Sequence, residues 1–361
     1  MVENLRSHFQ THATKSKEWR QQQLQQVALM FKHHGKEFEQ ALHDDMKQTA
    51  MVKTTEIQSC IFDAEQAISK LSEWMKDEEQ PNSFLMTYPG TAKIVKDPQG
   101  VVSIIGPWNY PISLIIRPAI GAIAAGNCIV LKPSEVASNC AKVLTKYVRE
   151  YLDNSAIAVV NGGVTETTEL LDQKFDYIFY TGNSTVGRII MQKAAVHLTP
   201  VTLELGGKSP LYIDGSFDWD VGISRIVWGK FLNCGQTCVA PDYILLDKKV
   251  DPKEFAAKLT AKIDSFFVQT STDKSDIKNC VHYGRIINEN HTKRLAATIQ
   301  EQKDKGAEIL YGGEVDVDDH YVQPTIVLNP ALDSKLMTEE TFGPILPILQ
   351  IEDHNAAIDF I

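Results

Sequence analysis

Several signals of other protein classes are missing from this 361-residue chain. Its six cysteines follow no CxxC rhythm, which argues against a disulfide framework or a zinc ribbon. Lys+Arg number 36 against 46 Asp+Glu, and the resulting net charge of −10 disfavours nucleic acid or an anionic membrane as the main partner. The GxGxxG fingerprint of many dinucleotide-binding domains is also absent.

Long hydrophobic runs are missing too. The most apolar region, residues 104–131, is interrupted by Pro, Asn, Arg and Gly, well short of the roughly 18 consecutive apolar residues that indicate a membrane span. The first residues, MVENLRSHFQ, lack the apolar core of a signal peptide. We therefore expect no membrane segment in this chain and a reducing, cytoplasmic compartment.

The apolar residues that are present change their period along the chain. The first eighty residues show the spacing of amphipathic helices. The two apolar stripes are Leu24, Val27, Phe31, Phe38 and Leu42, and then Ile57, Ile61, Ala64, Ile68 and Leu71. From Gly100 short apolar runs, VVSII, CIVLK, AIAVV, YIFYT and VTLEL, alternate with helix-length segments such as 136–152 and 186–197. This alternation predicts an α/β fold with parallel strands.

A second α/β domain is predicted after the first. Runs such as DYILLD and YVQPTIV read as strands, and residues 251–267 and 292–305 as helices. We expect two Rossmann-like open parallel-sheet domains, with residues 1–207 binding NAD(P) and residues 208–361 forming the catalytic domain. The polar, Pro-containing stretch 78–100 suits a projecting hairpin or bridging segment better than a core element.

Two turns of the first domain carry candidate cofactor-binding residues. Lys132 and Glu135 follow a buried strand directly, where the ribose of a dinucleotide would lie. A carboxylate accepts hydrogen bonds from a ribose 2′-OH and repels a 2′-phosphate, so Glu135 favours NAD, with NADP left open. Gly182, Asn183 and Gly187 could begin a helix whose amides face a pyrophosphate. A solvated helix cap at Pro133 and plain turn glycines are the ordinary alternatives.

The strongest chemical signal is Cys238, in the turn GQTCVAPDY. Gly235 and Thr237 leave little bulk over its sulfur, and an accessible thiolate can attack a carbonyl. Asn109, in the stiff loop GPWNYP, and the Cys238 backbone amide are candidate donors to the resulting oxyanion. Glu204, in LELGGKSP, is the candidate base, and we expect partial desolvation to raise its pKa. The ordinary alternatives are that Cys238 is a buried, inert cysteine and that Glu204 is a strand glutamate facing solvent.

Cys234, four residues before Cys238, raises the question of metal binding. Two thiols without a matching histidine or a second cysteine pair supply too few ligands for zinc, so no metal is expected. A reversible bridge between the two thiols stays open.

Six motifs together carry a family resemblance. In chain order they are GPWNYP, LKPSE, FYTGNSTVG, LELGGKSP, GQTCVAPDY and EETFGP. Their order and the residues between them resemble the aldehyde dehydrogenase superfamily along the whole chain. TGNSTVG and CVAPDY are most similar to its class 3 and fatty aldehyde dehydrogenase branch.

The resemblance implies further roles. Glu340 would bind the nicotinamide ribose and Phe342 would support the cofactor, although adjacent glutamates are usually only solvated charge. The family uses the 78–100 region for subunit contacts, which implies a homodimer. The branch implies medium- to long-chain aliphatic or aromatic aldehydes as substrates. The family continues well beyond Ile361, so the chain resembles a C-terminally truncated member, and a membrane anchor beyond that point is left open.

The implied reaction begins with attack of the Cys238 thiolate on an aldehyde and formation of a thiohemiacetal. Hydride transfer leaves a thioester, which Glu204 would help water to hydrolyse to the acid. The alternatives are a CoA-acylating aldehyde dehydrogenase, an acyl reductase, and a non-catalytic nucleotide-binding fragment. A hydrolytic base would be superfluous in the first two.

Overall fold

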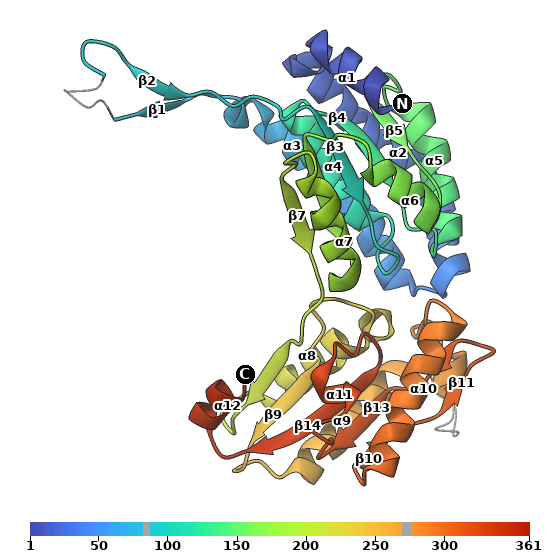
Figure 1. The fold of residues 1–361 in the computed structure, drawn as a ribbon. Helices are drawn as coiled ribbons and strands as arrows, with labels where there is room; N and C mark the ends of the chain where they lie inside the picture. The colour runs from blue at the N-terminus through green and yellow to red at the C-terminus, as the bar shows by residue number, and fades with distance from the viewer. Residues whose placement is uncertain (82–86, 269–275) are drawn as a thin grey trace. The chain divides into compact units, whose positions relative to one another are not determined.

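The computed structural model describes residues 1–81, 87–268 and 276–361 (Figure 1). The chain divides into two compact units. Unit 1 comprises Met1–Leu42 and Thr54–Leu205, and unit 2 comprises His43–Lys53 and Gly206–Ile361. Residues 43–53 therefore group with unit 2, although they lie within the predicted first domain.

Unit 1 is built on a five-stranded sheet in the order β5-β4-β3-β6-β7, and all its pairs are parallel. The strands are β3 (Val101–Ile105), β4 (Cys128–Lys132), β5 (Ile157–Val159), β6 (Tyr177–Thr181) and β7 (Val201–Glu204). Every residue of β3 and β4 is buried, which explains why these strands read as continuous apolar runs rather than as alternating patterns. The five strands predicted for this region are confirmed.

Unit 1 also contains helices. They are α1 (Val2–Gln10), η1 (Ala13–Lys15), α2 (Lys17–Met46), α3 (Ala50–Trp74), α4 (Ser113–Ala125), α5 (Ser138–Tyr151), α6 (Val164–Leu171) and α7 (Ser184–Ala195). The last residues of α2 and the first residues of α3 belong to unit 2. Both predicted stripes lie in the core except Ile68, which is only partly buried. Burial of one apolar face explains why these long segments are helical.

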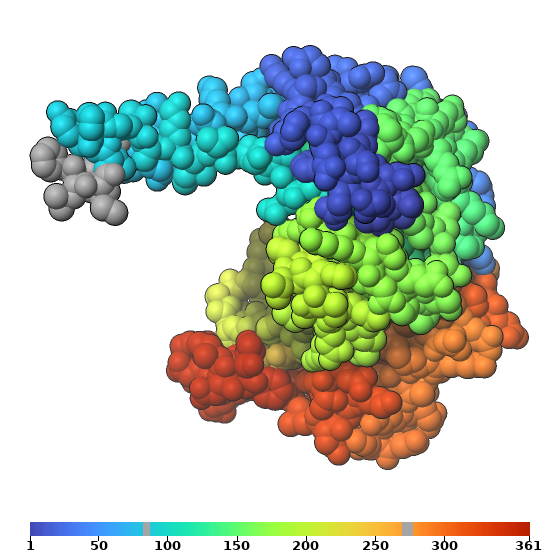
Figure 2. Space-filling view, turned by 45° about the horizontal axis from the view of Figure 1, so that its top comes forward, coloured from blue at the N-terminus to red at the C-terminus, as the bar shows by residue number. Residues whose placement is uncertain are grey.

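A two-stranded antiparallel sheet joins α3 to β3. Strand β1 (Glu78–Gln80) pairs with β2 (Ala92–Ile94), with Glu78 opposite Ile94. In Figures 1 and 2 this pair extends away from the helices and sheet of unit 1. The tip of the predicted hairpin, residues 82–86, lies outside the described residues.

Unit 2 contains a second five-stranded sheet, in the order β10-β13-β14-β9-β8. The strands are β8 (Pro210–Ile213), β9 (Tyr243–Asp247), β10 (Glu308–Tyr311), β13 (Thr325–Leu328) and β14 (Ile345–Ile351). Edge strand β10 runs antiparallel to β13, and the other pairs are parallel. The short segment between β10 and β13 contains a small sheet, β11 (Val315–Asp316) with β12 (Tyr321–Val322), instead of the helix that a parallel crossover needs.

Helices α8 (Trp219–Phe231), η2 (Leu232–Gly235), α9 (Pro252–Phe267), η3 (Asp276–Asn279), α10 (Glu289–Asp304), α11 (Lys335–Thr338) and α12 (His354–Phe360) complete unit 2. The predicted strand YVQPTIV is two strands, because Gln323 and Pro324 separate β12 from β13 and proline cannot donate to a ladder. Among the residues that the structure describes, no helix has the length and apolar character needed to cross a membrane.

Candidate active site

Predicted residues of unit 1 gather at the carboxyl edge of its sheet. Asn109 follows β3, Lys132 ends β4 and Glu204 ends β7. Gly182 and Asn183 follow β6 directly. Because parallel strands end at the same edge, one rim of the sheet carries an amide, a cation, a carboxylate and a helix N-terminus. Nucleotides bind at such a rim in open parallel sheets.

Lys132 is buried at this rim, while Glu135 is exposed. The Lys132 ammonium lies 2.6 Å from Oε2 of Glu135. Helix α5 begins only at Ser138, so the alternative of a helix cap with Pro133 in the first turn is wrong. Lys132 is thus the last residue of β4 and Glu135 lies in the loop after it, with its carboxylate exposed to a ligand hydroxyl.

A helix begins after β6, as predicted. Asn183 caps α7, since its side-chain oxygen accepts a hydrogen bond from the Val186 amide at 2.9 Å. The Gly182 amide donates to the carbonyl of Glu204 at 3.0 Å. A Cβ on Gly182 would collide with the Tyr180 ring, so glycine is required there for packing. The first-turn amides of a helix lack partners within the helix and suit an anion.

Glu204 is exposed, so the expectation that it is partly desolvated is wrong. The reason is its position as the last residue of β7, the edge strand of the sheet. Its carboxylate is accordingly accessible to water.

Asn109 is buried, with 3% of its surface exposed, in the loop between β3 and α4. A buried carboxylate anchors the end of that loop: Oε2 of Glu56 accepts the backbone amides of Ile112 and Ser113, each at 3.1 Å. Negative charge at a helix N-terminus is favourable, so Glu56 secures the start of α4. Sequence reasoning missed Glu56. Its one signal is an acidic residue beside the apolar stripe position Ile57.

Cys238 lies in unit 2 between η2 and β9, and its surface is partly exposed, whereas the other five cysteines are buried. Burial raises the pKa of Cys234 to about 12, which makes that thiol a poor nucleophile. All six cysteines lie in described residues, and all are free thiols. In the described part of the chain no three His, Cys, Asp or Glu side chains form a metal-binding group.

Glu340 and Phe342 lie in the loop before β14. Burial raises the pKa of Glu340, with the nearby Asp242 carboxylate adding to the effect. Phe342 has a left-handed backbone with φ of +43°. Arg294 holds this strained segment by donating to the carbonyls of Thr341 at 2.9 Å and Phe342 at 3.3 Å.

A buried group of charges supports the same loop, and sequence reasoning did not detect it. Asp242 lies directly before β9, and its carboxylate accepts a hydrogen bond from the Lys208 ammonium at 2.9 Å. The Lys230 ammonium lies 3.9 Å from the same carboxylate. Lys230 is 1% exposed, and burial lowers its pKa to about 8. Asp242 also accepts the Thr341 amide at 3.1 Å, which ties the Glu340 loop to the amino end of β9.

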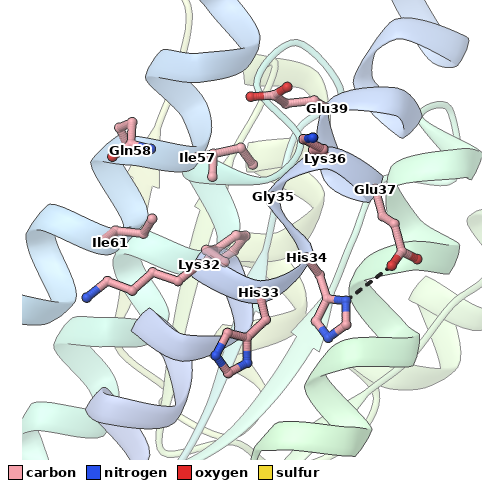
Figure 3. A pocket seen from close by; sticks show the side chains of 11 residues that line it. Lys32, His33, His34, Gly35, Lys36, Glu37, Glu39, Ile57, Gln58 and Ile61 are labelled. Carbon is pink, nitrogen blue, oxygen red and sulfur yellow. Dashed lines mark hydrogen bonds and ion pairs between the residues drawn. The ribbon is translucent and has the colours of Figure 1, made fainter.

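A surface pocket of about 630 Å³ lies between α2 and α3 (Figure 3). His34 and Glu37 both line it, and the His34 Nδ1 atom is 3.1 Å from the Glu37 carboxylate. Hydrogen bonds from Tyr147 and then His34 lower the pKa of Glu37 to about 2. None of the predicted site residues lines this pocket, and we assign it no part in the chemistry.

The chain is similar to known proteins along its whole length. Residues 1–361 match the aldehyde dehydrogenase family. The dog protein named "Aldehyde dehydrogenase, dimeric NADP-preferring" is 42% identical over 362 residues, which cover 100% of this chain and 77% of that protein. The Arabidopsis thaliana protein "Aldehyde dehydrogenase family 3 member H1" is 43% identical over 363 residues, 100% of this chain and 73% of that protein.

A solved structure agrees with these relatives. The substrate-bound state of Staphylococcus aureus AldH is similar at a TM-score of 0.93 and 37% identity, over 99% of this chain and 76% of that one. The fold, the ordered motifs and these similarities lead to one conclusion. The chain belongs to the aldehyde dehydrogenase family of NAD(P)-dependent enzymes.

Proposed function

We propose that this protein oxidises aldehydes to carboxylic acids with Cys238 as the nucleophile. The observation that carries the proposal is the contrast among the cysteines: Cys238 alone of the six is partly exposed, and it lies three residues after the turn that ends at Gly235. A nucleophilic thiol needs access, and buried thiols such as Cys234 lack it.

The side chains divide the work as follows. The Cys238 sulfur attacks the aldehyde carbonyl, and the side-chain amide of Asn109 and the Cys238 backbone amide donate to the resulting oxyanion. Bound NAD(P)+ supplies the acceptor for the hydride that leaves this adduct. Glu204 then takes a proton from a water molecule, which attacks the thioester, releases the acid and restores the Cys238 thiol.

The rim of the unit 1 sheet fits the cofactor. It offers the N-terminus of α7 to phosphates, and Lys132 with Glu135 to ribose hydroxyls. Gly187, whose Cβ would lie 3.0 Å from Leu205 and 3.7 Å from Leu203 of β7, allows α7 to pack closely on the end of that strand. In unit 2, Glu340 and Phe342 would hold the nicotinamide ribose.

For cofactor choice we propose NAD, with NADP also accepted. The Glu135 carboxylate is suited to a ribose 2′-OH. A dog relative is named NADP-preferring, and Lys132 can pair with a 2′-phosphate, which is why NADP is retained.

The domain roles and assembly are proposals as well. Residues 1–207 would bind NAD(P), and residues 208–361 would belong to the catalytic domain. A homodimer is proposed through the β1–β2 segment, whose strands are largely exposed, and the dog relative is named dimeric. Medium- to long-chain aliphatic or aromatic aldehydes are the proposed substrates, and the free thiols favour a reducing, cytoplasmic compartment.

The test is aldehyde-dependent reduction of NAD+ with and without CoA, with Cys238→Ala and Glu204→Gln beside the unsubstituted protein. We expect Cys238→Ala to be inactive. Glu204→Gln should give one stoichiometric burst of reduced cofactor without steady turnover, because the thioester would not be hydrolysed. Full activity of Cys238→Ala, or turnover of the unsubstituted protein only when CoA is present, would contradict the proposal.

A further inference from the structure

We propose that Gln236 is a positioning residue that holds the Cys238 loop in its reactive conformation. The inference rests on the proposed function of Cys238 as the nucleophile. Gln236 itself is fully buried and two residues before Cys238, so its side chain does not act on substrate.

The turn before Gln236 is conformationally costly. Asn233 and Cys234 are in the left-handed region, with φ of +51° and +55°, and Gly235 follows with φ of +72°. Non-glycine residues adopt this conformation at a cost of about 1–3 kcal/mol each, so the surrounding structure must hold them there. At Gly235 a Cβ would collide with the carbonyl of Gly343, so this position also requires glycine.

The side chain of Gln236 makes the bonds that hold this turn. Its Nε2 group donates to the carbonyls of Asn233 and Arg285, both at 3.0 Å, which uses both amide hydrogens. Its Oε1 atom accepts the backbone amide of Ile287 at 3.0 Å. One side chain thus closes the left-handed turn on itself and joins it to the segment 285–287.

That segment is itself firmly anchored within unit 2. The Arg285 guanidinium contacts the Asp319 carboxylate at 2.7 Å and lies 5.3 Å from the centre of the Tyr321 ring. The Arg285 amide donates to the carbonyl of Met46 at 3.0 Å. Gln236 therefore connects the nucleophile loop to a segment that an ion pair and a backbone hydrogen bond hold in place.

The alternative is that Gln236 only provides hydrogen bonds to buried backbone groups, as many buried polar side chains do. The two ideas differ in what the loop does when the bonds are lost. If Gln236 positions the loop, its loss releases the left-handed turn, moves Cys238 and exposes Cys234 beside it. If it only satisfies polar groups, stability falls while the loop keeps its conformation.

Gln236→Met removes the hydrogen bonds at nearly constant volume. Gln302→Met is the matched control, because Gln302 is also fully buried in unit 2 and accepts the Ala331 amide at 3.0 Å through its side chain. Gln236→Asn, one methylene shorter, provides a second variant if Gln236→Met does not fold. For each full chain we would measure kcat and KM, the unfolding midpoint, and alkylation of each cysteine by iodoacetamide with peptide mass spectrometry.

We expect both Gln236 variants to lose kcat roughly 100-fold with little change in KM, the size of effect that a misplaced reacting group produces. Cys234 should become alkylated in them, while Cys128 and Cys140, buried in unit 1, stay protected. Gln302→Met should lower the unfolding midpoint and leave kcat and Cys234 protection unchanged. If Gln236→Asn matches Gln302→Met in kcat and Cys234 protection while Cys238→Ala is inactive, the proposal is overturned and the proposed function stands. An active Cys238→Ala would instead remove the proposed function itself.

Discussion

The Asp242 carboxylate accepts a hydrogen bond from the backbone amide of Thr341, 99 residues further along the chain, at 3.1 Å. The same carboxylate neutralises Lys208 and faces the buried ammonium of Lys230. One side chain thereby fixes the loop of Glu340 and compensates two cations.

Asp242→Asn should therefore destabilise the protein strongly. The neutral amide keeps the shape of the side chain but leaves Lys230 buried without its countercharge, and breaking a buried ion pair costs about 3–5 kcal/mol. Urea unfolding at pH 7 would measure the loss. Asp359→Asn, on the exposed face of α12, is the control and should change stability by less than about 0.5 kcal/mol. Equal effects of the two substitutions would refute the role of Asp242.

The buried ammonium of Lys230 should make the free energy of unfolding increase with pH in the alkaline range. Burial lowers its pKa from 10.5 to about 8, so between those values the unfolded chain binds more protons at this lysine than the folded chain does. The contribution of Lys230 to the free energy of unfolding should then increase as pH rises from about 8 to 10.5, by at most about 3 kcal/mol.

Lys230→Met should abolish this component. Urea unfolding of both proteins across pH 7.5–10.5 measures it as the difference between the two curves, and Lys253→Met, at a lysine with 72% of its side chain exposed, serves as control. Parallel curves for the Lys230→Met and unsubstituted proteins would count against the buried cation.

Asn109→Ala should slow catalysis far more than it affects substrate binding. Loss of one oxyanion donor costs about 10²–10³ in kcat. The control is Asn127→Ala, also a buried asparagine of unit 1, whose side chain accepts the Gly100 amide at 3.0 Å and donates to the Ala122 carbonyl at 3.2 Å. It should lower stability and leave kcat unchanged. Similar kcat values for the two variants would remove Asn109 from the mechanism.

Glu135→Gln should shift cofactor preference toward NADP. The substitution removes the charge that repels a 2′-phosphate and leaves Lys132 to attract one, so the ratio of kcat/KM for NADP+ to that for NAD+ should rise about tenfold, or 1.4 kcal/mol. Glu150→Gln, an exposed glutamate on α5, should leave the ratio unchanged. An unchanged ratio in Glu135→Gln would show that this carboxylate does not face the ribose.

Glu56→Gln tests the anchor of α4. Loss of the charge at the helix N-terminus, with weaker acceptance of the Ile112 and Ser113 amides, should cost about 1–2 kcal/mol. Thermal unfolding would measure it. Glu65 lies on α3, as Glu56 does, and forms an ion pair with Lys32; the side chains of Lys32 and Glu65 are 47% and 52% exposed. Glu65→Gln removes this exposed pair and should cost less than about 1 kcal/mol. A smaller loss for Glu56→Gln than for Glu65→Gln would contradict the capping role.

Local patterns were sufficient for much of the fold. Burial of β3 and β4 on both faces produces the apolar runs VVSII and CIVLK, and the stripe from Leu24 to Leu42 follows from one buried helix face. The family was predicted from ordered motifs, and the match to residues 1–361 confirms it. The antiparallel direction of β10 escaped prediction because the chain returns to β13 without the usual crossover helix.

The site was predicted less completely, for a physical reason. Cys238, Asn109 and Lys132 occupy motifs that can be read locally, and their roles stay predictions. Glu56 and Asp242 were missed because their partners lie 56 and 99 residues away, and nothing in the sequence near them marks those contacts. Glu204 was wrongly expected to be shielded, since its neighbours Leu203 and Leu205 do not reveal that β7 is an edge strand.

The grouping of His43–Lys53 with unit 2 has a consequence for how the protein is made. The ribosome delivers this segment before most of unit 1 and long before Arg285 and Asp319, which bind the Met46 carbonyl and the Lys47 ammonium. The segment must therefore wait until Arg285 and Asp319 have been synthesised. A gene fragment encoding residues 206–361 alone would lack that piece, so it would not encode the whole of unit 2.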